Sequence, residues 1–104
     1  MTVSKLDDAA RVAALSNLPH WNYDAEAQGI RRSLRFADFG AAFAFMAHVA
    51  ILAEKADHHP EWSNVYNRVA VTLTTHDVSG LSMKDFELAR FMDQIAAALS
   101  TQTH

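Results

Sequence analysis

Apolar residues recur at three- or four-residue spacing in three stretches of the chain, which is the period of an amphipathic helix. In the first stretch we expect Ser4 to cap a helix whose opening turn holds Asp7 and Asp8. The stretch has an alanine-rich apolar face, and Pro19 predicts that the helix ends near residues 17–19.

The second helical stretch covers residues 37–56 and is apolar over a broad surface. Its residues at helical spacing include Phe39, Phe43, Met46 and Ala50. Such a broad surface is typical of a helix that packs on its own sheet and also on another subunit. Pro60 prevents this helix from continuing past His59.

The third helical stretch opens at Ser82. Asp85 stands three residues later and can take the place of glutamate in a capping box. The residues that follow give the helix one apolar and one polar side. The apolar side includes Phe86, Ala89, Ile95, Ala96 and Leu99.

Two strands are predicted between the first and second helices. Residues 21–23 form a short strand, Gln28 and Gly29 mark a turn, and residues 30–36 form a longer strand. Three apolar side chains fall on one face of the longer strand: Ile30, Leu34 and Phe36.

Residues 61–66 and 69–76 alternate like the two strands of a hairpin, with Asn67 and Arg68 as its tight turn. This register opposes Tyr66 with Val69, Trp62 with Leu73 and His59 with His76. The core-facing side chains would be Trp62, Tyr66, Val69, Val71 and Leu73. His59 and His76 would share the other, more polar face, an arrangement that a one-residue slip would destroy.

The predicted order of elements is α-β-β-α-β-β-α. It indicates an α+β fold, in which three helices pack on one face of a four-stranded antiparallel sheet. The 104 residues contain no repeat, low-complexity run or linker, so we expect residues 1–104 to form a single domain.

Composition narrows the function classes. The net charge of -3 argues against broad nucleic-acid binding, although Arg31, Arg32 and Arg35 leave room for a local basic patch. The absence of cysteine excludes disulfides and thiolate chemistry. The N-terminus lacks the pattern of a secretion signal, and the apolar residues 36–53 include Asp38 and His48. We therefore expect a cytoplasmic protein without a membrane span.

The segment from Glu54 to Asp85 concentrates the candidate chemistry. It holds His58, His59 and His76 together with acidic side chains. Histidine can give and take protons near neutral pH, and carboxylates orient the imidazole ring. The segment is therefore the predicted site of acid–base chemistry.

The spacing within this segment resembles the signature of the pterin-4a-carbinolamine dehydratase family. The signature is an acid, three residues, His-His-Pro, five residues, an aromatic, nine residues, His, eight residues and Asp. These positions are filled by Glu54, His58, His59, Pro60, Tyr66, His76 and Asp85. The resemblance extends from about Trp21 to the last helix, and it implies the same order of helices and strands.

The resemblance implies a 4a-hydroxytetrahydrobiopterin dehydratase, which removes water from the 4a-carbinolamine to give a quinonoid dihydropterin during tetrahydrobiopterin recycling. This reaction needs no redox cofactor and no metal, so no cofactor is expected. By resemblance, His58 and His76 would transfer protons, and His59, as the third histidine of the catalytic set, would mainly hold the substrate. The substrate-binding residues would be Glu54, Asp57, Pro60, Trp62 and Asp85.

The sequence leaves the contacts of several of these residues open. Glu54 lies one helical turn before His58 and can reach the same side if the helix extends that far. Trp21 and Trp62 could pack against a flat pterin ring, although the predicted register turns Trp62 toward the core. Lys84 stands beside Asp85 where some relatives have arginine, which keeps a cation but loses bidentate geometry.

Two alternatives to metal-free catalysis remain open. Glu54, His58, His59 and His76 are also plausible metal ligands, although adjacent histidines on a regular element diverge. The chain could instead be a non-catalytic dimerisation or assembly cofactor of a protein partner, as some relatives are. The apolar surface of residues 37–56 predicts a homodimer or homotetramer in either case. An aromatic amino-acid hydroxylase remains open as a partner.

Overall fold

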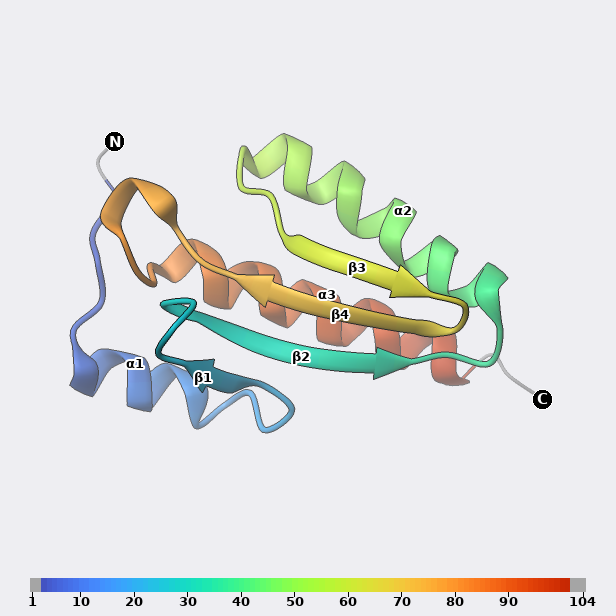
Figure 1. The fold of residues 1–104 in the computed structure, drawn as a ribbon, viewed down its shortest axis with the longest axis horizontal. Helices are drawn as coiled ribbons and strands as arrows, with labels where there is room; N and C mark the ends of the chain where they lie inside the picture. Colours follow the sequence, from blue (N-terminus) through green and yellow to red (C-terminus); the bar gives the residue numbers. More distant parts are fainter. Residues whose placement is uncertain (1–2, 102–104) are drawn as a thin grey trace.

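The computed structural model describes residues 3–101, in which three α-helices and four strands follow the order α-β-β-α-β-β-α. The elements are α1 (Asp8–Leu15), β1 (Asn22–Asp24), β2 (Gly29–Arg35), α2 (Phe39–Ala56), β3 (Glu61–Val65), β4 (Arg68–Leu73), the short 3-10 helix η1 (His76–Val78) and α3 (Met83–Thr101) (Figure 1). The expected α+β fold and its order of elements are confirmed.

The four strands form one antiparallel sheet in the order β1-β2-β4-β3. The central strands β2 and β4 pair from Ile30 with Leu73 to Arg35 with Arg68. Helices α2 and α3 contact one another and lie on the same side of the sheet (Figure 1). One face of the sheet is therefore covered by helices, and the other is open.

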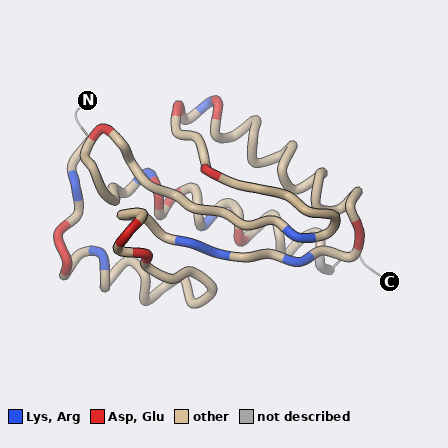
Figure 2. The backbone as a smooth tube through the Cα atoms, viewed as in Figure 1, with Lys and Arg blue, Asp and Glu red and all other residues tan. Residues whose placement is uncertain are grey.

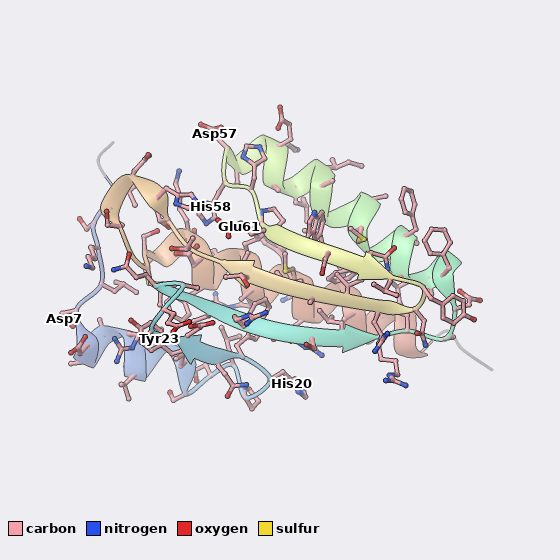
Figure 3. The ribbon with its side chains drawn as sticks, in the orientation of Figure 1. Asp7, His20, Tyr23, Asp57, His58 and Glu61 are labelled. Carbon is pink, nitrogen blue, oxygen red and sulfur yellow. The ribbon has the colours of Figure 1, made fainter. Side chains whose placement is uncertain are left out.

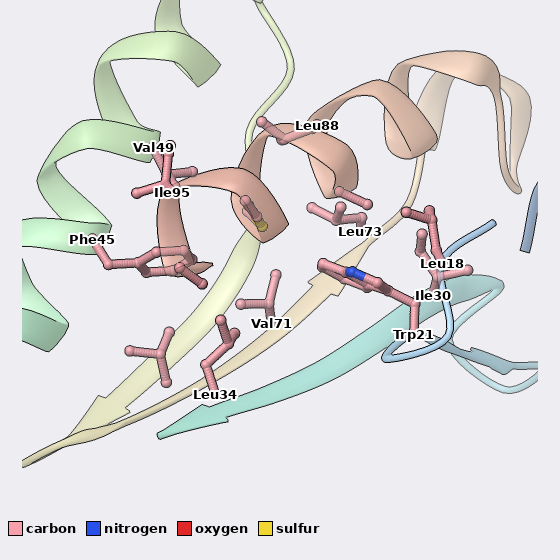
Figure 4. Packing of buried hydrophobic residues seen from close by; sticks show 14 of the residues in the cluster. Leu18, Trp21, Ile30, Leu34, Phe45, Val49, Val71, Leu73, Leu88 and Ile95 are labelled. Atoms are coloured by element: carbon pink, nitrogen blue, oxygen red, sulfur yellow. The ribbon is translucent and has the colours of Figure 1, made fainter. Parts of the chain in front are cut away.

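The core lies between the sheet and these two helices (Figure 4). Its buried side chains include Ile30, Leu34, Val71 and Leu73 from the sheet, Phe45 and Val49 from α2, and Leu88 and Ile95 from α3. Full burial of one such side chain contributes about 1.5–3 kcal/mol. This packing fixes the positions of the C-terminal end of α2 and the N-terminal end of α3 relative to the sheet.

The first helix begins later than the sequence indicated, because Asp7 is its cap instead of Ser4. The Asp7 side chain accepts a hydrogen bond from the Ala10 N–H at 2.8 Å. The Leu6 N–H donates to the Leu81 carbonyl at 2.8 Å, which holds the preceding residues against the loop before α3. Because the Leu6 N–H is bonded to Leu81, the residues before Asp7 are not part of the helix.

The turn between β3 and β4 is Tyr66-Asn67, so the predicted Asn67-Arg68 turn is wrong. Val65 pairs with Arg68, and Tyr66 has a φ of 52°. The Asn64 side chain donates to the carbonyls of Tyr66 and Arg68, at 3.0 and 2.8 Å. These bonds close the turn one residue earlier than the sequence pattern indicated.

The earlier turn shifts the partner of each β3 residue by two positions along β4. Trp62 opposes Val71 instead of Leu73, and a shift of two keeps Trp62 on the core face, where it is half-buried. Tyr66 is 62% exposed, so its predicted place in the core is wrong. The predicted opposition of His59 and His76 is also wrong, because both residues lie outside the paired strands.

Arginines are concentrated along β2 (Figure 2), and the burial pattern of the strand divides their side chains between the two faces of the sheet. Arg32 points toward α3 and forms an ion pair with Asp93. Arg31 is exposed, and its Nη1 lies 3.4 Å from Oδ2 of Asp24. Arg35 is also exposed and pairs across the sheet with Arg68. The three neighbouring arginines therefore do not form one basic patch.

Helix α2 exposes a large part of its apolar surface. Ala42, Phe45, Val49 and Ala53 are buried in the fold, whereas Phe39, Phe43 and Ile51 are 49%, 57% and 63% exposed. By length and composition alone, α2 could cross a membrane. Its packing against α3 and β4 is that of a core helix with a second, uncovered apolar side.

Candidate active site

The candidate site lies where α2 ends, β3 begins and the segment after β4 leads into α3. His58 and Glu61 lie close to this corner, away from Asp7, His20 and Tyr23 (Figure 3). The backbone reverses at Asp57, which has the left-handed φ of 52°. The N–H groups of Asp57 and His58 donate to the carbonyls of Glu54 and Ala53, which is the Schellman pattern of a helix end.

His58 follows this reversal and points into the protein. Its Nε2 lies 2.6 Å from Oδ1 of Asp85, the third residue of α3. His58 is 8% exposed and Asp85 is 0% exposed. Asp85, which the sequence predicted as a substrate-binding residue, is therefore fully buried and reaches the site through His58.

The second oxygen of Asp85 is held by the protein. Its Oδ2 accepts from the Ser82 N–H at 3.0 Å and from the Thr75 hydroxyl at 2.8 Å. The bond from Ser82 is the capping-box bond that the sequence predicted for the start of the last helix. One carboxylate therefore caps α3 and fixes the ring of His58.

His59 turns outward and pairs with Glu54. Its Nε2 lies 2.9 Å from Oε1 of Glu54, and both side chains are exposed. The sequence placed Glu54 beside His58, and the structure corrects this partner. Helix α2 ends at Ala56, so the reversal at Asp57 sends His58 inward and leaves His59 near the last turn of the helix.

His76 also pairs with a carboxylate. Its Nε2 lies 2.8 Å from Oε2 of Glu61, the first residue of β3. Both side chains are exposed, at 80% and 56%. All three histidines of the signature therefore meet a carboxylate through Nε2. Within residues 3–101, however, no three acidic or histidine side chains form a group that could hold a metal ion.

The other residues that the sequence analysis considered for the site differ in how far they are exposed to solvent. Asp57 is exposed and Pro60 is half-buried between His59 and β3. Trp21 is 4% exposed and its Nε1 donates to Asp93 at 2.8 Å, so its ring belongs to the core and not to a ligand surface. His20 and His48 are exposed, and His104 lies outside the described residues.

A groove of about 590 Å³ between α2 and α3 opens beside His58. Lys55 and Lys84 line it, together with apolar side chains such as Leu52 and Leu88. Lys84 keeps a cation next to Asp85, as the sequence indicated. The groove gives the ring of His58 a route to the surface.

The sequence did not single out Glu61, Thr75 or Ser82 as site residues. Glu61 follows Pro60 directly, and the alternating pattern of the residues after it indicated only that it begins a strand. Thr75 immediately precedes His76, and Ser82 was recognised only as a helix cap. Their contacts join residues 3–15 positions apart and depend on how the strands and α3 meet.

Comparisons with known proteins point to one family. The pterin 4 alpha carbinolamine dehydratase family matches residues 4–95. A relative from Novosphingobium aromaticivorans is 57% identical and covers 89% of this chain and 97% of its own length. One from Burkholderia orbicola is 55% identical, with 91% and 93% covered. Each is named a "putative pterin-4-alpha-carbinolamine dehydratase".

A crystal structure of a transcriptional coactivator/pterin dehydratase from Brucella melitensis has the same fold. It superposes with a TM-score of 0.87 at 46% identity, over 89% of this chain and 99% of that one. The match over residues 4–95 and these relatives confirm the resemblance seen in the histidine spacing. The chain belongs to the pterin-4-alpha-carbinolamine dehydratase family.

Proposed function

We propose that this chain removes water from a 4a-hydroxytetrahydropterin by histidine acid–base catalysis and so serves the recycling of tetrahydropterin cofactors. Family membership supports the dehydratase activity. The observation that carries the mechanism is the set of three histidine–carboxylate pairs at one end of the sheet. Each carboxylate can orient the imidazole ring that it contacts.

The reaction needs one proton taken from a ring nitrogen and one delivered to the leaving hydroxyl. His58 and His76 are the proposed proton-transfer residues, and His59 is proposed to hold the substrate with Glu54. Asp57, Pro60 and the exposed part of the half-buried Trp62 side chain are also proposed to contact the substrate. A positioned acid or base contributes typically ~10²–10⁴-fold to a rate.

The test is the dehydration rate of freshly generated 4a-hydroxytetrahydropterin in the presence of a chelator. We expect wild type to accelerate the reaction and His58→Ala and His76→Ala each to lose ~10²-fold or more. His48→Ala is the matched control, because His48 is an exposed histidine in the middle of α2. Failure of well-folded wild type to accelerate dehydration would overturn the proposal, and loss only with chelator would favour a metal site.

Binding of a protein partner is the second candidate, and the exposed side of α2 favours it. The Brucella relative is described as a coactivator as well as a dehydratase. We propose that Phe43 and its exposed neighbours mediate self-association as a dimer or tetramer. Phe43→Glu should lower the mass seen by light scattering, whereas Val12→Glu, at a similarly exposed position of α1, should leave it unchanged. An unchanged mass for Phe43→Glu would contradict this assignment.

A further inference from the structure

The hydrogen bonds around Asp85 have only one consistent direction. The Lys84 N–H donates to Oγ of Ser82 at 3.3 Å. The hydroxyls of Ser82 and Thr75 lie 2.7 Å apart, and Thr75 Oγ1 lies 2.8 Å from Oδ2 of Asp85. A carboxylate only accepts, so Thr75 gives its single proton to Asp85. The Ser82 hydroxyl must then donate to Thr75.

The ionised form of Asp85, which this direction takes as given, places the proton of neutral His58 on the nitrogen that faces the carboxylate. Oδ2 of Asp85 already accepts two bonds, and Oδ1 faces Nε2 of His58 at 2.6 Å. The carboxylate has no proton to give, so Nε2–H is the donor. Asp85 also lies in the first turn of α3, where the helix dipole favours negative charge. The neutral ring of His58 therefore has its lone pair on Nδ1.

The Nδ1 atom keeps access to solvent. Among the described residues, no fully buried side-chain nitrogen or oxygen lacks a hydrogen-bond partner. The hydrogen bond of the His58 ring is made by Nε2, and His58 lines the groove between α2 and α3. The free nitrogen is therefore the one that a molecule at the surface can reach.

From these contacts we infer that Thr75 and Ser82 are positioning residues: through Asp85 they hold His58 as its Nε2–H tautomer and make Nδ1 the atom that exchanges protons with substrate. This inference rests on the proposed function for its catalytic consequence. Its structural part, the fixed tautomer, depends on the hydrogen bonds of His58 and of residues 75–85 and not on the proposed activity.

The assigned atom gives a balanced proton transfer. Nδ1 accepts the proton of the ring N–H, and the N–H bonding electrons form the new C=N bond as the C4a–O bond breaks. The imidazolium holds its other proton toward Asp85, so only the proton on Nδ1 is free to leave. Delivery of one proton to the departing hydroxyl releases water, and the net transfer moves a single proton from nitrogen to oxygen.

The first readout is the tautomer of His58, measured by long-range ¹H–¹⁵N NMR correlations of the imidazole ring at a pH where the ring is neutral. We expect wild type to show the Nε2–H form alone. Thr75→Val keeps the side-chain shape but removes the hydroxyl, and a mixture of tautomers is expected. Thr75→Ser should restore the wild-type spectrum, and exposed His20 and His48 serve as internal controls.

The second readout is the dehydration rate. We expect Thr75→Val to lower kcat about 10- to 100-fold, by analogy with the loss caused by removing the outer hydrogen-bond partner of a metal-bound histidine. Thr75→Ser should recover most of that loss. Ser82→Ala leaves the Ser82 N–H in place and should have a smaller effect of the same kind.

The two readouts separate this inference from the proposed function. If wild type dehydrates the substrate but Thr75→Val leaves both the tautomer and kcat unchanged, the positioning role is overturned while the function stands. If wild type shows a fixed tautomer that Thr75→Val disturbs but no dehydration, the function is overturned and the fixed tautomer stands. A wild-type Nδ1–H tautomer would overturn the inference outright.

Discussion

His58 and His59 are neighbours in the chain but lie in opposite environments. The side chains of His58 and its partner Asp85 are 9% and 0% exposed. Those of His59 and its partner Glu54 are 58% and 82% exposed, and the His76–Glu61 pair is similarly open. The same two chemical groups therefore form one rigid interior pair and two pairs at the surface.

The difference indicates a division of labour. An exposed ion pair contributes about 0–1 kcal/mol to stability, because water screens it and its side chains stay mobile. A buried pair whose partners are all satisfied fixes geometry, but loss of one member leaves costly unpaired groups. The interior pair is thus suited to hold a ring still, and the surface pairs are suited to rearrange around a ligand.

The sharpest way to break this comparison is Asp85→Ala. The change leaves the Nε2–H of His58, the Thr75 hydroxyl and the Ser82 N–H without their acceptor. Removal of one partner of a buried pair costs about 3–5 kcal/mol. We expect a loss of that size in the free energy of unfolding, measured by urea denaturation.

Glu54→Ala is the matched control for Asp85→Ala, because it removes a carboxylate from the exposed pair with His59. Its effect on the unfolding free energy should stay below about 1 kcal/mol. Equal effects of the two substitutions would show that burial does not distinguish the pairs, and the comparison would fail.

The contrast between the two histidines was only partly visible in the sequence. Helical and strand periodicity predicted the three α-helices and four strands in order but not η1, and the spacing of Ser82 and Asp85 predicted the capping box. The outward turn of His59 depends on a left-handed backbone at Asp57, and the hairpin register depends on another at Tyr66. Local pattern gives little sign of either, because glycine is the residue that usually marks this conformation.

Partner identities were harder to predict than elements. His76–Glu61 joins the first residue of β3 to the residue that opens η1, and His58–Asp85 spans 27 positions. Such contacts arise when tertiary packing brings distant segments together. Position along one helix suggested Glu54 for His58, and that reasoning failed because the helix had already ended.

Substitutions at Asp57 test the reversal that separates the two histidines. Left-handed backbone costs a residue with a Cβ roughly 1–2 kcal/mol, and a β-branched side chain fits it worst. We expect Asp57→Val to lower the unfolding free energy by about 1 kcal/mol, less than the full cost, because Asp57 already carries a Cβ. Asp57→Gly should keep or slightly raise stability, since glycine adopts this conformation freely.

The Asp57→Gly variant also isolates the carboxylate of Asp57 from its backbone role. A raised KM for the pterin with unchanged stability would support the proposed substrate contact of Asp57. An unchanged KM would limit Asp57 to ending the helix. Equal stabilities of Asp57→Val and Asp57→Gly would contradict the importance of the left-handed turn.

The smallest expected effect concerns the exposed His76–Glu61 pair. Glu61→Gln keeps the size of the side chain and removes its charge, so it weakens the pair across 2.8 Å without leaving a cavity. We expect the unfolding free energy to change by less than about 1 kcal/mol, and the change to shrink in 1 M salt, where the screening length falls to about 3 Å. The dehydration rate should fall even though the protein stays folded, because Glu61 orients His76, a proposed proton-transfer residue. A rate equal to wild type, in a variant with wild-type stability, would show that His76 works without its carboxylate. Of the two proposed proton-transfer residues, only His58 would then remain a candidate for dependence on its carboxylate.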